Sequence, residues 1–478
     1  MLEKNKTSRN SKRSANQRLA AFISDVAKNH SSEALQRSRR AVLDTIGCML
    51  IGIDEPIARN TLAAVSRWGC GTAPVVGMDI TLPAPWAALV NGSSAKAFDY
   101  DDWDDQGLTH TTATLLPAIL AMLDGRQASG LDLFDAHIIG VETIIRIGAA
   151  VNPEHYTRGW HATSTIGAIG ATAACARVMG LDTEQTGSAL SLATSMAGGS
   201  TTQFGTMAKP LHAGLAAKAG VLAATLATEG VTAHTDTLDG AISFASTMSD
   251  ATQADFGQHL DKLGNPWGIL EHGLHIKLYP SCGGTHRVIE AALELREAHS
   301  LKPDDIETVE INVSEFLCDL LPYGIPDNPT EALFSFPYCV AAALYWGQGG
   351  SRQFLPRAVD DKGVRQLAKR VLISSRHAPL RDRLFLEGDP DTVRVRTRSG
   401  ELLSSSVDVP LGAPPRFVDD ATVEHKFYEC AAKTLSTRRA KRISELVFCR
   451  NSDWPLLELT SLLRKEQHQL PTDQPEEE

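Results

Sequence analysis

Apolar residues recur at helical spacing near both ends of the chain. After Ser31 and Ser32 they fall three or four positions apart, a pattern that predicts a helix. Serine caps the free N–H groups at a helix start, and Gly52 is a plausible end. The same period returns after Asp419. The apolar positions that carry the two patterns are Leu35, Val42, Leu43, Ile46, Met49 and Leu50, and then Val423, Phe427, Cys430, Ala431, Ile443, Leu446 and Val447.

The middle of the chain is unusually rich in small residues. From Pro83 to about Gly230 the sequence is dominated by Ala, Gly, Ser and Thr. Within it, Ile166–Val178 and Leu215–Ala227 are apolar and long enough for helices. Small side chains let helices approach closely, so this region predicts a tightly packed helical domain.

The period of the pattern changes from helical to strand-like after Pro266. Residues 306–313, IETVEINV, alternate between apolar and polar, as a half-buried strand does. Two further strands are expected around Val393–Val395 and Leu402–Val409. Ser399-Gly400 between them is typical of a hairpin turn.

These patterns predict a mainly α-helical protein with an α+β lid. A large helical domain is built from both chain ends, and a smaller α/β domain is inserted between them. The expected limits are a disordered tail at 1–17, helical domain at 18–268, lid at 269–412, helical return at 413–465 and a second tail at 466–478.

Composition and charge narrow the possible functions. The chain has 478 residues, 43% of them hydrophobic and 22% charged, with a formal net charge of -11. This acidity argues against a nucleic-acid partner, although a local cationic pocket can still bind a small anion. No apolar run is expected to cross a membrane. The basic N-terminus is interpreted as a solvated tail, with an organelle transit peptide as the alternative.

The eight cysteines are scattered, and none forms a C-x-x-C pair. Dispersed cysteines in a long chain indicate a reduced protein, here expected in the cytoplasm. The spacing gives no zinc or iron–sulfur signature, so no metal site is predicted from it.

An acidic run lies between Asn91 and His110, NGSSAKAFDYDDWDDQGLTH. Such a run can bind a divalent cation through oxygen ligands, or it can be a solvated loop. The apolar flanks and Trp103 instead favour partial burial. A buried carboxylate near a histidine can then take part in proton transfer. The five aspartates are Asp99, Asp101, Asp102, Asp104 and Asp105.

Two further runs bring a histidine and a lysine into apolar surroundings. In RGWHATSTIGAIG, His161 precedes a small-residue helix and either binds an anion near its start or serves as a structural residue. In FGTMAKPLHAG, Lys209 must find a counter-ion or lose its proton, and the counter-ion is either a substrate carboxylate or an interdomain salt bridge. His212 lies nearby in the sequence and is expected simply to pack.

Two later runs supply a turn and a tyrosine. In HIKLYPSCGGTH, Cys282 near His286 suggests a thiolate nucleophile. The favoured interpretation is that the two adjacent glycines allow backbone N–H groups to approach an anion closely. Lys277 precedes this turn. In SFPY, Tyr338 either donates a hydrogen bond to a carboxylate or is a buried residue at a helix start.

Taken in order, these runs resemble the MmgE/PrpD family, which includes 2-methylcitrate dehydratase, cis-aconitate decarboxylase and iminodisuccinate epimerase. The resemblance spans about residues 20 to 460. The matching stretches are AVLDTIGCMLIG (41–52), AALVNGSSAKAFDYDD (87–102), THTTATLLPAILA (109–121), RGWHATSTIGAIGATAACARVMGLD (158–182), FGTMAKPLHAGLAAKAGVLAATLA (204–227), IKLYPSCGGTH (276–286) and FSFPYCVAAAL (334–344).

The resemblance implies a site in a cleft between helical domain and lid, a homodimer, and no required cofactor. Carried over by motif, it implies pocket roles for Asp99 of the D-x-D-D motif and for His110, which follows that loop. It implies the same for His161 of G-W-H and Lys209 of G-T-M-x-K-P. Lys277 before Y-P and Tyr338 of S-x-x-Y match the remaining pocket positions.

The chain also departs from the family pattern on the expected pocket wall. Trp103 stands where the family commonly has threonine, and Thr111 where it often has proline. Lys96 replaces a frequent histidine, and Asp104 and Asp105 add charge. These departures leave the substrate open.

The residues together predict acid–base chemistry beside a carboxylate of a small di- or tricarboxylate. Lys209, Lys277 and Tyr338 would hold carboxylates, while His161 or His110 moves a proton and Asp99 tunes a histidine. Cys282, His286 and Trp103 are expected to complete the substrate-binding wall. The outcome would be dehydration or decarboxylation, with epimerisation, metal-dependent chemistry at the acidic loop, or binding without catalysis as alternatives.

Overall fold

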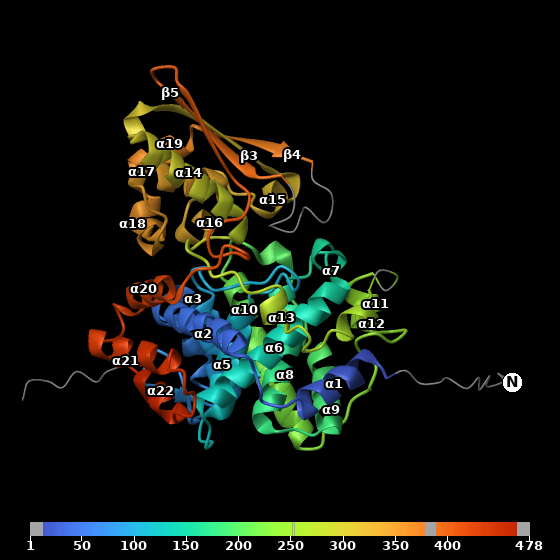
Figure 1. Ribbon diagram of the computed structural model, residues 1–478. Coiled ribbons are helices and arrows are strands. Elements are labelled where there is room, and N and C mark those ends of the chain that lie inside the picture. The colour runs from blue at the N-terminus through green and yellow to red at the C-terminus, as the bar shows by residue number, and fades with distance from the viewer. Residues whose placement is uncertain (1–12, 251, 253, 378–388, 466–478) are drawn as a thin grey trace, which may run out of the picture.

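The computed structural model describes residues 13–250, 252, 254–377 and 389–465. Figure 1 shows a larger helical body with a smaller body above it, the latter yellow to orange. The larger body is mainly helical and the smaller one combines helices with a four-stranded sheet, as the sequence predicts. The expected tail at 466–478 and the first twelve residues of the expected N-terminal tail lie outside the described residues.

The larger body takes its helices from the chain before the smaller body and from the chain after it. They are α1 Ala15–Asp25, α2 Ser32–Gly52, α3 Pro56–Val65, α4 Ala84–Ala95, α5 Thr111–Leu123, α6 Gly130–Val151, α7 Glu154–Thr157, α8 Ala162–Met179, α9 Thr183–Thr194, η1 Thr201–Gln203, α10 Ala208–Thr228, α11 Phe244–Met248, α12 Phe256–Leu260, α13 Gly268–Glu271, α20 Asp420–Ala431, α21 Thr437–Val447 and α22 Leu456–Leu462. A short antiparallel pair, β1 Ala73–Pro74 and β2 Thr81–Leu82, joins them.

The helix predicted after Ser31 is α2, and its bounds agree closely with the pattern. The Ser31 side chain accepts a hydrogen bond from the Ala34 N–H, and the helix ends at Gly52. The returning helix α20 packs along α2, so the two distant parts of the chain share one core, as predicted. At the N-terminus the prediction of a tail through residue 17 is wrong, because α1 begins at Ala15 behind a Ser14 cap.

Close helix packing in the small-residue region depends on glycine. A Cβ added at Gly214 of α10 would lie 2.2 Å from the Leu89 carbonyl oxygen of α4, and one at Gly92 would lie 2.7 Å from the Gly214 Cα. Both distances are far inside van der Waals contact. The two glycines therefore allow α4 and α10 to cross in direct backbone contact, which brings the end of α4 close to the start of α10.

Helix α10 corrects one expectation from the sequence. Its 21 residues are long and apolar enough to cross a membrane, whereas no such run was expected. Within its most apolar window 61% of the residues are buried in the protein, and the helix packs against α4 and α8. These contacts are typical of a core helix.

The smaller body combines a sheet with helices along its face. Its elements are η2 Gly283–Thr285, α14 His286–His299, η3 Pro303–Asp305, β3 Ile306–Ser314, α15 Glu315–Leu320, α16 Pro329–Ala332, α17 Phe336–Trp346, η4 Ser351–Phe354, α18 Pro356–Val359, α19 Lys362–Ala368, β4 Val371–Arg376, β5 Asp391–Thr397 and β6 Leu402–Val407. Strand order is β4-β3-β5-β6, with β4 parallel to β3 and the other pairs antiparallel.

Strands β3, β5 and β6 match the predicted alternating runs, and the hairpin turn at Gly400 has a φ of +91°. Strand β4 was not predicted, because Leu372 and Ile373 are exposed and the run lacks a clear alternation. Helix α14 packs on β5 and β6 and covers their inner face.

The chain enters and leaves the smaller body at neighbouring points. The Ile276 N–H donates to the Gly412 carbonyl at 3.0 Å, and Trp103 and His275 exchange backbone hydrogen bonds of 3.2 and 2.8 Å. The acidic run and the crossing segment are therefore joined directly where the two bodies meet.

Candidate active site

Three helices begin at one point of the larger body, and their first residues carry the candidate chemistry. His110 directly precedes α5, His161 directly precedes α8, and Lys209 lies in the first turn of α10. The His110 N–H donates to the Thr163 hydroxyl at 3.1 Å, which ties the start of α5 to that of α8. Helix starts carry partial positive charge, so their convergence favours a bound anion.

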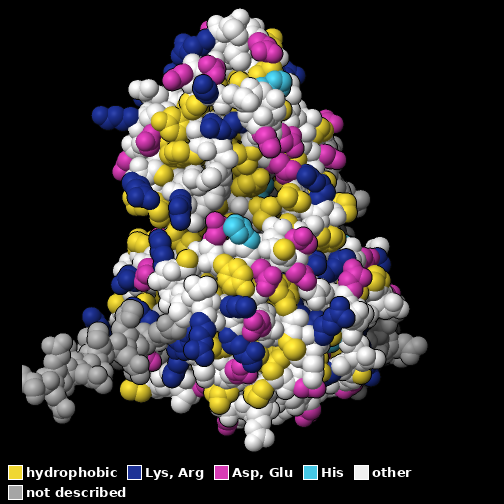
Figure 2. All heavy atoms as spheres, turned by 60° about the vertical axis from the view of Figure 1, so that its left-hand side comes forward, with side chains coloured by type: hydrophobic (Ala, Val, Ile, Leu, Met, Phe, Trp, Pro, Cys, Tyr) yellow, Lys and Arg dark blue, Asp and Glu magenta, His cyan; other side chains and the backbone are white. Residues whose placement is uncertain are grey.

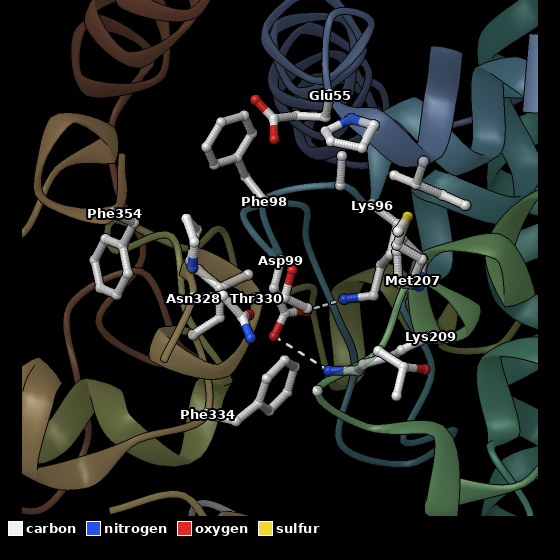
Figure 3. Close-up of a pocket in the computed structure, with 18 of the residues that line it drawn as sticks. Glu55, Lys96, Phe98, Asp99, Met207, Lys209, Asn328, Thr330, Phe334 and Phe354 are labelled. Carbon is white, nitrogen blue, oxygen red and sulfur yellow. Dashed lines mark hydrogen bonds and ion pairs between the residues drawn. The ribbon is translucent and has the colours of Figure 1, made fainter. Parts of the chain in front are cut away.

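A cluster of three buried lysines surrounds Asp99. We call Lys96, Lys209 and Lys277 the lysine cluster. The Lys96 ammonium donates to Asp99, and the Lys209 and Lys277 Nζ atoms lie 3.2 and 3.3 Å from its carboxylate oxygens. The Lys277 Nζ also donates to the Asp99 carbonyl at 2.8 Å, which helps hold this residue at a φ of +51°. Figure 3 shows Lys96 and Lys209 approaching Asp99 from the same side.

The acidic run is a buried, hydrogen-bonded segment, so its interpretation as a solvated loop is wrong. Asp101 lies 3.4 Å from the Lys96 Nζ and 3.1 Å from His110 Nδ1. Asp102 accepts from the Thr112 N–H at 2.9 Å, and burial raises the pKa of its carboxyl to about 8. Asp104 accepts from the Thr111 hydroxyl at 2.7 Å, and burial raises its pKa to about 6.

Burial also lowers the pKa of the lysines and histidines that face Asp99 and the three helix starts. Removal from water disfavours an ammonium, and it lowers the pKa of Lys209 to about 7 and of Lys277 to about 8. Burial lowers the pKa of Lys96 well below its usual value. The pKa of His110 and of His161 is also well below its usual range, first through burial and then through neighbouring cations and, for His161, through His212.

A small void lies where these groups meet, and we call it the inner cavity. Its volume is about 20 Å³, close to the space for one water molecule. Binding of a larger anion therefore requires the wall to move. The wall consists of Trp103, Leu108, His110, Tyr156, His161, Phe204, Lys209, Lys277, Cys282 and Gly283.

Seven of the nine predicted residues therefore meet at one place. Six of them line the inner cavity: His110, His161, Lys209, Lys277, Cys282 and Trp103. Asp99 joins them through its ion pairs with two of the lysines. His161 and Lys209 share the Phe204 ring, which lies 5.0 Å from the imidazole centroid and 4.4 Å from the Lys209 Nζ.

The structure does not bring Tyr338 or His286 to the inner cavity. Tyr338 is fully buried beside Phe354, and its hydroxyl donates to the Gln353 carbonyl, so it fits the alternative of a structural tyrosine. His286 begins α14 and packs edge-on against Tyr279, with the two ring centroids 5.2 Å apart.

Two lysines, one aspartate and one histidine at the site were not assigned a role from the sequence. Lys96 was noted only as a departure, although its apolar surroundings carry the same signal as those of Lys209. His212 contacts His161 through Nδ1 atoms 2.8 Å apart. Asp101 contacts Lys96 and His110, and Lys426 of α20 reaches the Tyr100 and Lys277 carbonyls at 2.7 and 2.9 Å.

Asp99, Asp101 and His110 could together offer ligand atoms to a metal ion. The ammonium of Lys96 contacts both carboxylates, and two more lysines contact Asp99. This concentration of positive charge opposes a cation and favours an anion. The donor set therefore suits an anion better than a metal ion.

Family models match both bodies. The MmgE/PrpD N-terminal domain matches residues 17–257, and the MmgE/PrpD C-terminal domain matches residues 279–451. The chain belongs to the MmgE/PrpD family. This agrees with the resemblance found in the ordered motifs.

Similar members of the MmgE/PrpD family carry the name cis-aconitate decarboxylase. The chain is 28% identical over 462 residues to the cis-aconitate decarboxylase-like protein oryM of Aspergillus oryzae, covering 91% of this chain and 94% of that protein. It is 27% identical to cis-aconitate decarboxylase of Mus musculus, with 88% of both chains covered. It is 26% identical to the human protein of that name, with 91% of both covered.

Proposed function

We propose that this MmgE/PrpD protein is a lyase that decarboxylates a small polycarboxylate of the cis-aconitate type without a metal or organic cofactor. One observation carries the proposal: two histidines and two lysines line the same buried cavity between the bodies. The names of the similar proteins support decarboxylation over the other reactions of the family.

The lysine cluster would bind substrate carboxylates in place of Asp99. The ammonium groups of Lys209 and Lys277, together with the starts of α5, α8 and α10, can neutralise a polyanion that water no longer solvates. When the bond to the leaving carboxylate breaks, CO2 departs and its electron pair stays on carbon, delocalised into a neighbouring carboxylate. Lys209 and Lys277 would stabilise this developing charge in a site that excludes water.

A proton must then reach the carbon. His161 and His110 are neutral in the free protein, because burial and adjacent cations depress the pKa of each. A bound polyanion reverses the local charge and raises the pKa of both imidazoles, so either can take up a proton and donate it. The Lys209 ammonium, with a pKa near 7, is the competing donor.

Nuclear magnetic resonance in deuterium oxide tests the reaction with cis-aconitate and a panel of di- and tricarboxylates. We expect loss of CO2 with one deuterium incorporated into the product. His161→Ala and Lys209→Ala should each lower turnover about 100-fold or more, because each removes a group that acts on the reacting atoms.

Matched controls lie on the same chain. Lys218→Ala removes another lysine of α10, one that contacts Trp86, and His234→Ala removes an exposed histidine. Both should retain normal turnover. Near-normal rates in His161→Ala and Lys209→Ala would contradict the proposal. Proton exchange without CO2 would indicate an epimerase, ligand binding without turnover a binding protein, and loss of activity on chelation a metal enzyme.

A further inference from the structure

A fourth buried lysine, Lys426 of α20, contacts the backbone that carries the lysine cluster. Its Nζ lies 2.6 Å from a carboxylate oxygen of Asp44 on α2. The same ammonium donates to the Tyr100 carbonyl at 2.7 Å and to the Lys277 carbonyl at 2.9 Å, and it lies 3.8 Å from the centroid of the Tyr100 ring. One buried cation therefore joins α2 and α20 to the acidic run and to the segment that leads into the smaller body.

Lys426 and Lys277 bind neighbouring carbonyl groups of the acidic run. The Lys277 Nζ donates to the Asp99 carbonyl at 2.8 Å, and the Lys426 Nζ donates to the next carbonyl, that of Tyr100. Lys426 also binds the carbonyl of Lys277 itself. It therefore restrains both sides of the contact between Lys277 and Asp99: the backbone beside Asp99 and the backbone that carries the Lys277 side chain.

The two bodies meet at a surface where hydrophobic side chains gather, as Figure 2 shows. Apolar contact is non-directional, so it favours association without fixing one segment against another. Hydrogen bonds restrain both distance and angle. The bonds from Lys426 to the two carbonyls therefore restrain the acidic run against the segment of Lys277 in a way that apolar contact cannot.

Asp44 keeps Lys426 charged in surroundings that exclude water. Burial acts to lower the pKa of Lys426, but neighbouring acidic groups, Asp44 foremost, raise it above its usual value. Burial raises the pKa of Asp44 to about 6, so this carboxyl is ionised at neutral pH. Lys426 therefore stays an ammonium where Lys209 and Lys277 titrate, which suits a group that holds the backbone and moves no proton.

We propose that Lys426, paired with Asp44, is a positioning residue of the reaction: it fixes Lys277 against Asp99, so that Lys277 and Lys209 can bind one polyanion. This inference rests on the proposed function and adds to it two residues that do not touch the reacting atoms. A misplacement of about 1 Å in a group that acts on the substrate can lower turnover about 100-fold.

A double variant, Asp44→Leu with Lys426→Met, tests the role in the full-length protein. Replacing both partners of a buried ion pair by apolar side chains leaves no unpaired charge, so the variant is expected to fold. It loses the bonds to the Tyr100 and Lys277 carbonyls, and kcat/KM for cis-aconitate should fall about 10- to 100-fold. Wild-type kcat/KM in the folded double variant would overturn the inference and leave the proposed function intact.

The titration of Lys277 is a readout that a purely structural role would not move. Burial lowers the pKa of Lys277 to about 8, and the Lys426 cation contributes to this, against the opposing effect of Asp101 and Cys282. Loss of Lys426 and entry of water into a loosened contact should both raise the pKa of Lys277 in the double variant. An unchanged pKa in the folded variant would contradict the proposal.

Nuclear magnetic resonance of carbon-13-labelled lysine measures this pKa, with the Lys277 signal identified by its absence in Lys277→Arg. The measurement needs no substrate. It therefore tests the placement of Lys277 even if cis-aconitate is not turned over, a result that would refute the proposed function alone.

Arg146 of α6 provides a matched control. It is also a buried cation with a carboxylate partner, Glu142 at 2.8 Å, and it donates to the carbonyls of Lys262 and Pro266 at 3.2 and 2.6 Å. None of these four residues lines the inner cavity. Glu142→Gln with Arg146→Met should leave kcat/KM and the Lys277 titration of the folded protein unchanged. A fall in kcat/KM as large as that of the first double variant would assign the loss to general destabilisation and overturn the inference.

Discussion

Lys209 illustrates how a single residue acquires its chemistry from burial. It lies among Phe204, Phe334 and Asp99, with its Nζ 4.4 and 4.1 Å from the two ring centroids. Aromatic faces and one carboxylate stabilise the ammonium, but loss of water outweighs them and lowers the pKa to about 7. A lysine that titrates near neutrality can change charge during a catalytic cycle.

This shift predicts a pH dependence for the capture of a polyanion. Lys209 is an ammonium below its pKa and neutral above it, so kcat/KM should fall as pH rises through about 7. Arginine stays protonated over this range. In Lys209→Arg the fall in kcat/KM should therefore move to a higher pH, toward about 8, the pKa of Lys277. Steady-state kinetics from pH 6 to pH 9 measure this shift. An unchanged profile in Lys209→Arg would assign the fall to another group, and Lys218→Arg serves as control.

The pairing of His161 with His212 gives a second prediction at this scale. The two Nδ1 atoms lie 2.8 Å apart, so one imidazole must donate and the other accept, which couples the tautomer of His161 to that of His212. His212→Ala should lower kcat about 10- to 100-fold with little change in KM. It should also raise the pKa of His161, because His212 depresses it.

Imidazole titration by nuclear magnetic resonance distinguishes this positioning role from a purely structural one. If His212 had only a structural role, His212→Ala would lower the stability of the protein and leave the pKa of His161 unchanged. His234→Ala, at an exposed site, is the control for both measurements.

At the scale of elements, the crossing of α4 and α10 determines where the lysine cluster forms. Lys96 directly follows α4, and Lys209 lies in the first turn of α10. The crossing at Gly92 and Gly214 places these two helix ends together. Helix geometry thus explains why lysines separated by more than a hundred residues contact the same aspartate.

Gly214→Ala tests this explanation. The added Cβ would meet the Leu89 carbonyl at 2.2 Å and force the helices apart. We expect a loss of about 1–3 kcal/mol in the free energy of unfolding and a reduced kcat/KM, because the lysines separate. Denaturant unfolding and kinetics on one preparation measure both.

Gly187→Ala on α9 is the matched control, since its nearest neighbour would be the Ala20 Cβ at 3.8 Å. It should not lose stability, because alanine favours a helix over glycine. Indistinguishable behaviour of the two variants would refute the role of the crossing.

At the scale of the whole molecule, the site draws on both bodies. His110, His161 and Lys209 come from the larger body, while Cys282 and Phe334 come from segments of the smaller one. Lys426 of the returning helix α20 contacts Asp44 at 2.6 Å and the Lys277 carbonyl. It therefore links α20 to α2 and to the segment that leads into the smaller body. The homodimer expected from the resemblance stays a prediction.

Because the site spans both bodies, a bound polycarboxylate should stabilise the whole molecule. At a fixed concentration equal to one hundred times the dissociation constant of the wild type, cis-aconitate should raise the free energy of unfolding of the wild type by about 2.7 kcal/mol. Differential scanning calorimetry should show this gain in the wild type and in Lys218→Ala, but not in Lys209→Ala. A gain of the same size in Lys209→Ala would exclude that lysine from binding.

The sequence by itself determined the helical and strand periods and the cap at Ser31. It also determined the return of the C-terminal part of the chain to the larger body, and the membership of the MmgE/PrpD family. Each depends on patterns within a short segment or on the order of such segments. It also indicated most of the site, because a lysine or histidine in apolar surroundings needs a partner.

Only the tertiary structure decided which of these residues meet. The Lys209 to Asp99 contact joins positions 110 residues apart, and it depends on how α4 and α10 cross. The same packing directs the Tyr338 hydroxyl to the Gln353 carbonyl and brings His212 to His161. Local sequence carries each side chain's chemistry, but its neighbours across the fold are set by packing that no short segment encodes.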